Sequence, residues 1–120
     1  MKVLIIGGVA TGPKVAARLK RLRPDVEITV VEQGEAISYG ACGLPLYLGN
    51  IVPELAELQM TNAGLVRDVK YFREQKGVKF LTATQAVKIN RKEKNVLAKN
   101  LKTSEEQLLP YDFLVLATGA

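Results

Sequence analysis

Residues 3–12 of the chain read Val-Leu-Ile-Ile-Gly-Gly-Val-Ala-Thr-Gly. Four aliphatic residues followed by two glycines predict a short strand that is buried on both faces. Pro13 follows where proline is favoured in the first turn of a helix, and Pro24 ends that helix. The residues between the prolines form an apolar stripe at helical spacing: Val15, Ala16, Leu19 and Leu22. The β-branched segment 27–31 predicts a second strand, which completes a β-α-β unit.

The turn between the first strand and the helix has the composition of a phosphate-binding loop. Gly7 allows a tight turn, and Gly12 allows the helix and the strand to approach each other closely. Backbone N–H groups at the start of the helix would then face a pyrophosphate. Val9 occupies the place of the middle glycine in the G-x-G-x-x-G pattern. The predicted contact residues are Gly7, Gly8, Val9, Ala10 and Gly12.

An acidic residue after the second strand supports a dinucleotide site. Glu32 lies twenty residues beyond Gly12. A carboxylate at this place can accept hydrogen bonds from both hydroxyls of an adenosine ribose, and it disfavours a 2′-phosphate. The pattern therefore predicts NAD or FAD rather than NADP. The alternative is an ordinary surface glutamate beside a glycine turn.

The remaining segments predict how this unit is completed. Helices are expected over residues 53–60 and 62–76; in the second, Leu65, Val69 and Phe72 share a face. The other segments predict strands, three of them joined by charged turns as an antiparallel meander: 78–81, 86–90, 96–101, 108–111 and 113–118. We expect an α/β fold, a Rossmann-like parallel sheet with flanking helices plus a small antiparallel β-meander, with no internal domain boundary.

Two further segments carry a family resemblance. The last strand ends in Ala117-Thr118-Gly119, and residues 38–49 read Ser-Tyr-Gly-Ala-Cys-Gly-Leu-Pro-Leu-Tyr-Leu-Gly. With the glycine turn, they resemble the N-terminal FAD-binding segment of the pyridine nucleotide–disulfide oxidoreductases. The cysteine segment is similar to the branch of coenzyme A-disulfide reductases, NADH oxidases and persulfide reductases. The resemblance spans all 120 residues. It implies FAD as cofactor, bound by the glycine turn, Glu32, Gln33, the backbone near Ala86, Ala117, Thr118 and Gly119.

Cys42, the single cysteine, is the predicted redox centre. A short helix is expected to open at Cys42-Gly43 and run through Tyr47, and the positive end of its dipole would favour the thiolate. The resemblance implies that this cysteine works alone beside the flavin, forming a mixed disulfide with coenzyme A or being oxidised by a peroxide or sulfane sulfur. It also makes Ser38 a substrate or flavin contact. Ala41 replaces an asparagine that is frequent in the branch, and the alternative for Cys42 is a buried small hydrophobic residue.

The positive charge is concentrated at the N-terminus. Residues 1–24 contain six basic and no acidic residues, whereas the rest of the chain contains eleven basic and twelve acidic ones. Lys14, Arg18 and Arg21 are four and three positions apart, and therefore lie on one helical face. The resemblance implies that they contact the phosphates of coenzyme A; a solvated charged face is the alternative. Without a recognition motif, this charge does not indicate a nucleic-acid partner.

The composition excludes several kinds of site. Because the chain has no His, it cannot contain a Ser-His-Asp or Cys-His system or a His-ligated zinc, and no metal site is expected. One Cys allows no internal disulfide, which favours a reducing, cytoplasmic compartment. The apolar runs are too short to span a membrane, so no membrane partner is expected.

The resemblance also implies a larger enzyme. Residues 1–120 are expected to be the first segment of an FAD/NAD(P)-binding domain, with NADH-binding and C-terminal dimerisation domains lying outside them. The whole enzyme would be a homodimer that uses NADH, FAD and Cys42 to reduce a coenzyme A disulfide, persulfide or polysulfide. The segment alone is expected to bind FAD weakly or not at all, and to have no NADH-driven turnover. Two alternatives are an NADH oxidase or peroxidase with a Cys sulfenic acid, and a non-catalytic dinucleotide-binding module.

Overall fold

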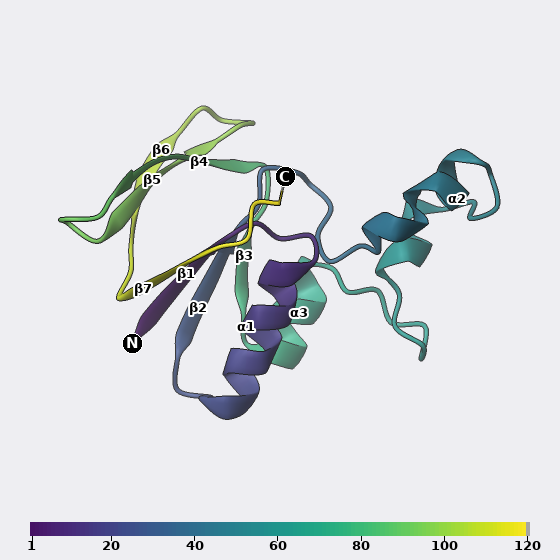
Figure 1. Cartoon of the computed structure of the whole chain (residues 1–120), viewed down its shortest axis with the longest axis horizontal. Coiled ribbons are helices and arrows are strands. Elements are labelled where there is room, and N and C mark those ends of the chain that lie inside the picture. Colours follow the sequence, from purple (N-terminus) through teal and green to yellow (C-terminus); the bar gives the residue numbers. More distant parts are fainter. Residues whose placement is uncertain (120) are drawn as a thin grey trace.

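The computed structural model describes residues 1–119, which form two sheets (Figure 1). The first is entirely parallel, with the strand order β3-β2-β1-β7. Ile5 lies opposite Val30 on one side and Val115 on the other, so the carboxyl ends of these strands meet at one edge. The strands are β1 (Lys2–Ile6), β2 (Glu27–Val31), β3 (Lys79–Leu81) and β7 (Phe113–Leu116).

The second sheet is the predicted meander. Its three antiparallel strands are neighbours in chain order: β4 (Thr84–Asn90), β5 (Asn95–Asn100) and β6 (Glu106–Pro110). A shift in register between Ala86 and Lys88 bends β4. The α/β fold with an added meander is therefore confirmed.

The two faces of the parallel sheet bury different partners. Val3 and Ile5 of β1 face the side covered by α1 (Thr11–Leu22) and α3 (Val69–Lys76). There Ala16 is completely buried, and Phe72 packs against Phe80 with ring centroids 4.8 Å apart. Alternate residues, including Leu4, face the other side, where Val96 and Tyr111 close a second core. Both long helices therefore lie on one face, and the meander covers the other (Figure 1).

The predicted helix over residues 62–76 is wrong in its first half. Gly64 has φ +77°, and Met60 pairs with Val66 in an antiparallel bridge, so the chain turns back before the helix begins. The helix starts at Val69, where the Asp68 carboxylate accepts a hydrogen bond from the Tyr71 N–H at 2.8 Å. The first backbone N–H groups of a helix have no carbonyl partner within it, and the Asp68 side chain supplies one at this helix start. Leu65 is consequently outside the helix and 56% exposed.

Two other helix predictions need correction. Residues 53–60 contain a 3-10 turn, η2 (Leu55–Gln59), rather than an α-helix. Cys42 lies within another 3-10 turn, η1 (Ala41–Gly43), and Gly43 is the N-cap of α2 (Leu44–Leu48). We call residues 39–67 the Cys42 arm, which lies to one side of the sheet (Figure 1). Leu22, expected in the apolar stripe of α1, is its last residue and is 61% exposed.

Candidate functional site

The glycine turn occupies a place where side chains do not fit. Gly7 has φ +111°, and a Cβ added to it would lie 2.1 Å from the backbone oxygen of Ala117. A Cβ on Gly12 would lie 1.9 Å from the backbone oxygen of Gly7. The Gly7 N–H also donates to the Val31 carbonyl at 2.9 Å. The turn is therefore packed directly against the ends of β2 and β7, as the predicted roles of both glycines require.

The N-terminus of α1 presents free backbone donors at this turn. The N-cap residue Ala10 makes no side-chain capping bond, and within the described structure the first helical turn contains no acidic residue. The first N–H groups of a helix have no partner inside the helix, and they carry the positive end of its dipole. This arrangement fits a pyrophosphate.

Glu32 braces the same turn through both carboxylate oxygens. Its Oε2 accepts a hydrogen bond from the Gly8 N–H at 2.6 Å, and its Oε1 accepts one from the Gly34 N–H at 2.7 Å. An ionised carboxylate has about four acceptor positions. Glu32 can therefore hold the turn and still accept hydrogen bonds from ribose hydroxyls. This bracing role was not predicted from the sequence, because it depends on the turn folding back toward β2.

Two adjoining hollows collect the predicted cofactor-binding residues. One, of about 570 Å³, is lined by Gly7, Gly8, Val9, Ala10, Thr11, Glu32, Leu116, Ala117, Thr118 and Gly119. The other, of about 220 Å³, is lined by Ile6, Gly7, Val31, Glu32, Gln33, Thr84, Gln85, Ala86 and Thr118. Together they have the size of a small-molecule site. Gly12 is the one predicted cofactor-binding residue outside both, because it is buried where α1 meets β1. Thr84 and Gln85 were not predicted.

The cysteine segment is joined to the glycine turn by a backbone hydrogen bond. The Ser38 N–H donates to the Gly8 carbonyl at 2.8 Å, and Ser38 is buried with φ +51°. Four residues later, Cys42 is an exposed free thiol outside the two hollows. The alternative reading of Cys42 as a buried hydrophobic residue is therefore wrong. Cys42 lies two residues before the start of α2, a helix of only five residues.

The predicted basic face of α1 opens onto a hollow that α3 shares. Lys14, Arg18 and Arg21 line it with Ala17, and Lys76 reaches it from the last turn of α3; its volume is about 330 Å³. Among the described residues, the carboxylate ion pairs involve other basic residues: Arg23, Arg73 and Lys102. We call the four residues Lys14, Arg18, Arg21 and Lys76 the basic groove. Lys76 was not predicted, because nothing in the sequence shows that α3 packs beside α1.

Comparison with known proteins identifies the family. The family model described as pyridine nucleotide-disulphide oxidoreductase matches residues 1–120. The chain belongs to this family. The resemblance predicted from the glycine turn, the cysteine segment and Ala117-Thr118-Gly119 is thus confirmed.

The relatives of the chain are considerably longer than it is. A coenzyme A disulfide reductase from Staphylococcus haemolyticus (strain JCSC1435) is 35% identical over 119 residues, which are 99% of this chain and 26% of that protein. An NADH oxidase from Enterococcus faecalis (strain ATCC 700802 / V583) is 31% identical over 120 residues, which are 100% of this chain and 25% of that protein. The chain spans about a quarter of the length of these curated relatives.

Solved structures show the same relationship. The structure of a NAD-dependent persulfide reductase from A. fulgidus superposes with a TM-score of 0.94 at 46% identity, covering 100% of this chain and 22% of that one. A water-forming NADH oxidase from Lactobacillus brevis gives a TM-score of 0.85 at 26% identity, covering 99% of this chain and 25% of that one. Within residues 1–119, the helices are too short or too polar to cross a bilayer.

Proposed function

We propose that this chain is the FAD-binding N-terminal segment of an NADH-dependent oxidoreductase that reduces a disulfide, persulfide or polysulfide through Cys42. One observation carries the proposal: an exposed lone thiol lies four residues from Ser38, whose N–H is bonded to Gly8 of the glycine turn. A dinucleotide in the turn and a sulfur substrate at Cys42 would therefore bind at two places that this hydrogen bond and a short segment of chain connect. The names of the relatives, coenzyme A disulfide reductase and persulfide reductase, support the same substrate class.

The residues around the two hollows fit the ADP half of FAD. The backbone donors at the start of α1 would hold the pyrophosphate, and Glu32 would accept hydrogen bonds from the ribose hydroxyls. Gln33 and the backbone near Ala86 would contact the adenine, and residues 117–119 would close over the cofactor. When bound, FAD would accept a hydride from NADH and pass two electrons to sulfur.

Cys42 would supply the sulfur chemistry. Its thiolate attacks one sulfur of a disulfide RSSR, which forms the mixed disulfide Cys42–S–SR and releases RS⁻. Two electrons from one NADH then cleave the mixed disulfide, which releases a second RS⁻ and restores the Cys42 thiolate. The sum is NADH + H⁺ + RSSR giving NAD⁺ and two RSH. Because Cys42 is exposed, a substrate can reach its sulfur without local unfolding.

The basic groove supports coenzyme A as the thiol that the substrate carries. Guanidinium and ammonium groups form charge-assisted hydrogen bonds with phosphates. Four such groups from two helices line a single hollow, and their charges are not neutralised by the described ion pairs. Coenzyme A, which carries a 3′-phosphate and a diphosphate, suits this charge. The remaining domains of the enzyme and a homodimeric assembly belong to the same proposal.

The mass of the Cys42 peptide tests the function. The full-length, FAD-loaded protein would be incubated with coenzyme A disulfide and digested without reductant. We expect Cys42 to gain the mass of coenzyme A, and NADH to remove that mass. A gain of one oxygen after peroxide treatment, without a thiol adduct, would instead favour an oxidase or peroxidase with a sulfenic acid, which the Enterococcus faecalis NADH oxidase relative makes the second candidate. An unmodified Cys42 during NADH turnover would contradict both.

Charge reversal in the basic groove tests the substrate. In the full-length enzyme, Arg18→Glu with Arg21→Glu should raise the KM for coenzyme A disulfide at least about tenfold, because each lost charge-assisted bond contributes about 1.5–3 kcal/mol. The KM for polysulfide, which carries no phosphate, should stay unchanged. The matched control reverses Arg91 and Lys92, which are exposed in the turn between β4 and β5. An equal increase of both KM values would remove the basic groove from the proposal.

A further inference from the structure

Leu58, near the end of η2, contacts the chain on both sides of Cys42. The Gly40 N–H donates to the Leu58 carbonyl at 2.8 Å. On the other side of Cys42, the Leu58 side chain lies against Gly43, since a Cβ added there would be only 2.5 Å from Leu58 Cδ2. Leu58 therefore fixes the residue two before Cys42 and the residue directly after it. Cys42 itself remains exposed.

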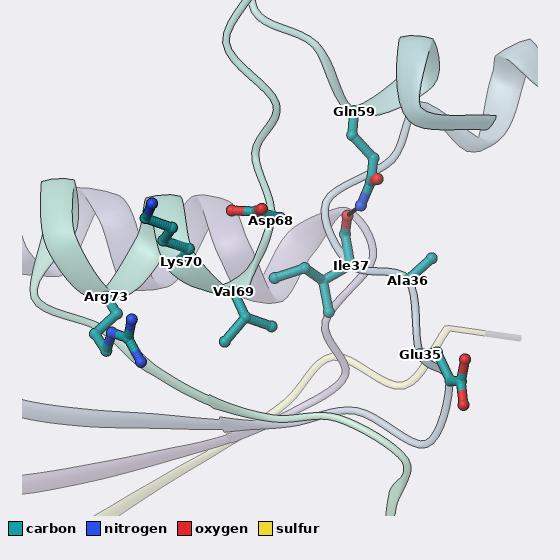
Figure 2. A pocket seen from close by; sticks show the side chains of 8 residues that line it. All are labelled: Glu35, Ala36, Ile37, Gln59, Asp68, Val69, Lys70 and Arg73. Atoms are coloured by element: carbon teal, nitrogen blue, oxygen red, sulfur yellow. Dashed lines mark hydrogen bonds between the residues drawn. The ribbon is translucent and has the colours of Figure 1, made fainter. Parts of the chain in front are cut away.

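Gln59, the next residue, joins this support to the body of the fold. Its Nε2 donates to the Ile37 carbonyl at 2.6 Å, and Figure 2 shows its side chain directed at that oxygen. The Ile37 side chain is buried in the core beneath α1 and α3. The Gln59 carbonyl accepts two further bonds from Arg67, from its N–H at 3.0 Å and its Nε at 2.9 Å. Gln59 thus connects Ile37, two residues before the Cys42 arm, with Arg67 at the end of the arm.

The hydrogen bond from Gln59 to Ile37 lies next to a contact with the glycine turn. Ile37 precedes Ser38, whose N–H is bonded to the Gly8 carbonyl. Gly8 in turn donates its N–H to Glu32 at 2.6 Å. A series of short hydrogen bonds, together with the peptide bond between Ile37 and Ser38, therefore connects Gln59 with Gly8 and Glu32. These two residues belong to the proposed binding sites of the pyrophosphate and the ribose. Ser38 has φ +51°, a conformation that surrounding contacts must hold in place.

We propose that Gln59 is a positioning residue for Cys42. Its side-chain amide fixes η2 to Ile37, and η2 fixes Gly40 and Gly43, so that the thiol keeps one position relative to the glycine turn. Cys42 matters to the reaction only under the proposed function, on which this inference rests. The mechanical part, the fixing of residues 39–44 by Gln59, is a property of the chain itself.

The test compares three variants of the full-length, FAD-loaded protein. Gln59→Met keeps the length of the side chain but removes the donor to Ile37. Gln59→Lys restores a donor at the same place, and Gln75→Met is the matched control on the exposed surface of α3. In Gln59→Met, the amides of residues 39–44 should exchange hydrogen about fivefold faster or more, the change expected for one lost hydrogen bond. Exchange in β1 and β2 should be unchanged.

Kinetics provide the second readout. Disulfide reduction, which requires Cys42, should fall about fivefold to 100-fold in Gln59→Met, because a small misplacement of a reacting group reduces its rate steeply. NADH-driven reduction of ferricyanide, which bypasses the thiol, should be unaffected. Gln59→Lys should recover part of the disulfide activity and the slow exchange. This split between half-reactions separates positioning from a general loss of stability.

Each outcome decides the inference. Unchanged exchange in residues 39–44, or equal acceleration throughout the protein, would overturn it. If the unaltered enzyme reduces no disulfide, the proposed function fails, and the exchange result still decides the role of Gln59. If Gln59→Met folds poorly, Gln59→Asn, which keeps the amide but shortens the side chain by one methylene, tests the same bond by the same exchange measurement.

Discussion

Replacing Gly7 with alanine is expected to lower the free energy of unfolding by about 3 kcal/mol and to abolish dinucleotide binding. The backbone at φ +111° is unfavourable for any residue with a Cβ, at a cost of about 1–2 kcal/mol. The new Cβ would also lie 2.1 Å from the Ala117 oxygen, so β1 and the segment after β7 must separate. Overpacking of this kind costs about 1–3 kcal/mol. Urea unfolding and FAD titration would measure the two effects.

Two other glycines distinguish the cost of the backbone conformation from the cost of the close contact with Ala117. Gly64 has φ +77° but no atom within 4 Å of an added Cβ, so Gly64→Ala measures the backbone cost alone. Gly40 has φ −74°, and its nearest atom would be the Leu58 oxygen at 3.6 Å, so Gly40→Ala should be nearly neutral. If Gly7→Ala cost no more than Gly64→Ala, the close packing of the turn against Ala117 would be wrong as an explanation.

The parts of the fold that were predicted correctly depend on short stretches of sequence. The β-α-β unit follows from the spacing of aliphatic residues around Gly7 and Gly12, and the meander follows from short apolar segments between charged turns. Because these signals act within a few residues, tertiary contacts reinforce them without changing them. The positions of Glu32, Gln33 and Ala86 at one edge of the sheet then follow from the order of the strands.

The errors occur where distant parts of the chain decide the local structure. The helix predicted over residues 62–76 is an exception, because it fails for local reasons: Gly64 turns the chain, and Asp68 caps the helix that follows. Lys76 joins the basic groove only because α3 packs beside α1. The contacts of Leu58 and Gln59 require the arm to return toward Ile37, which no periodic pattern indicates.

Most of these errors lie in the Cys42 arm, and this location bears on function. The cofactor hollows are built almost entirely from strand ends and a glycine turn, whose positions the regular sheet determines. The thiol is carried instead by an arm of short 3-10 and α-helical turns, outside both cores. The step proposed to be common to the family, electron transfer to and from a dinucleotide, would thus use the regular sheet and its strand ends. Contacts with a particular sulfur substrate would instead involve the Cys42 arm, whose structure is harder to predict from its local sequence.

Replacing Cys42 with serine in the full-length enzyme is expected to reduce NADH-dependent disulfide reduction at least about 1,000-fold, the scale of removing a covalent nucleophile. A serine hydroxyl is far less ionised than a thiol at neutral pH, and it cannot form the mixed disulfide. The substitution should leave folding intact, because the side chain is exposed and free. FAD content, and NADH-driven reduction of ferricyanide, should therefore stay within about twofold of the unaltered enzyme.

The matched control is Ala63→Ser, an exposed residue elsewhere in the Cys42 arm. It should retain full disulfide reduction, because it adds a hydroxyl to the arm without removing the thiol. Disulfide reduction that persists in Cys42→Ser would show that electrons reach the substrate by another route and would remove Cys42 from the proposed function. Loss of ferricyanide reduction together with disulfide reduction would instead place Cys42 in the structure of the cofactor site, contrary to its exposed position beyond the two hollows.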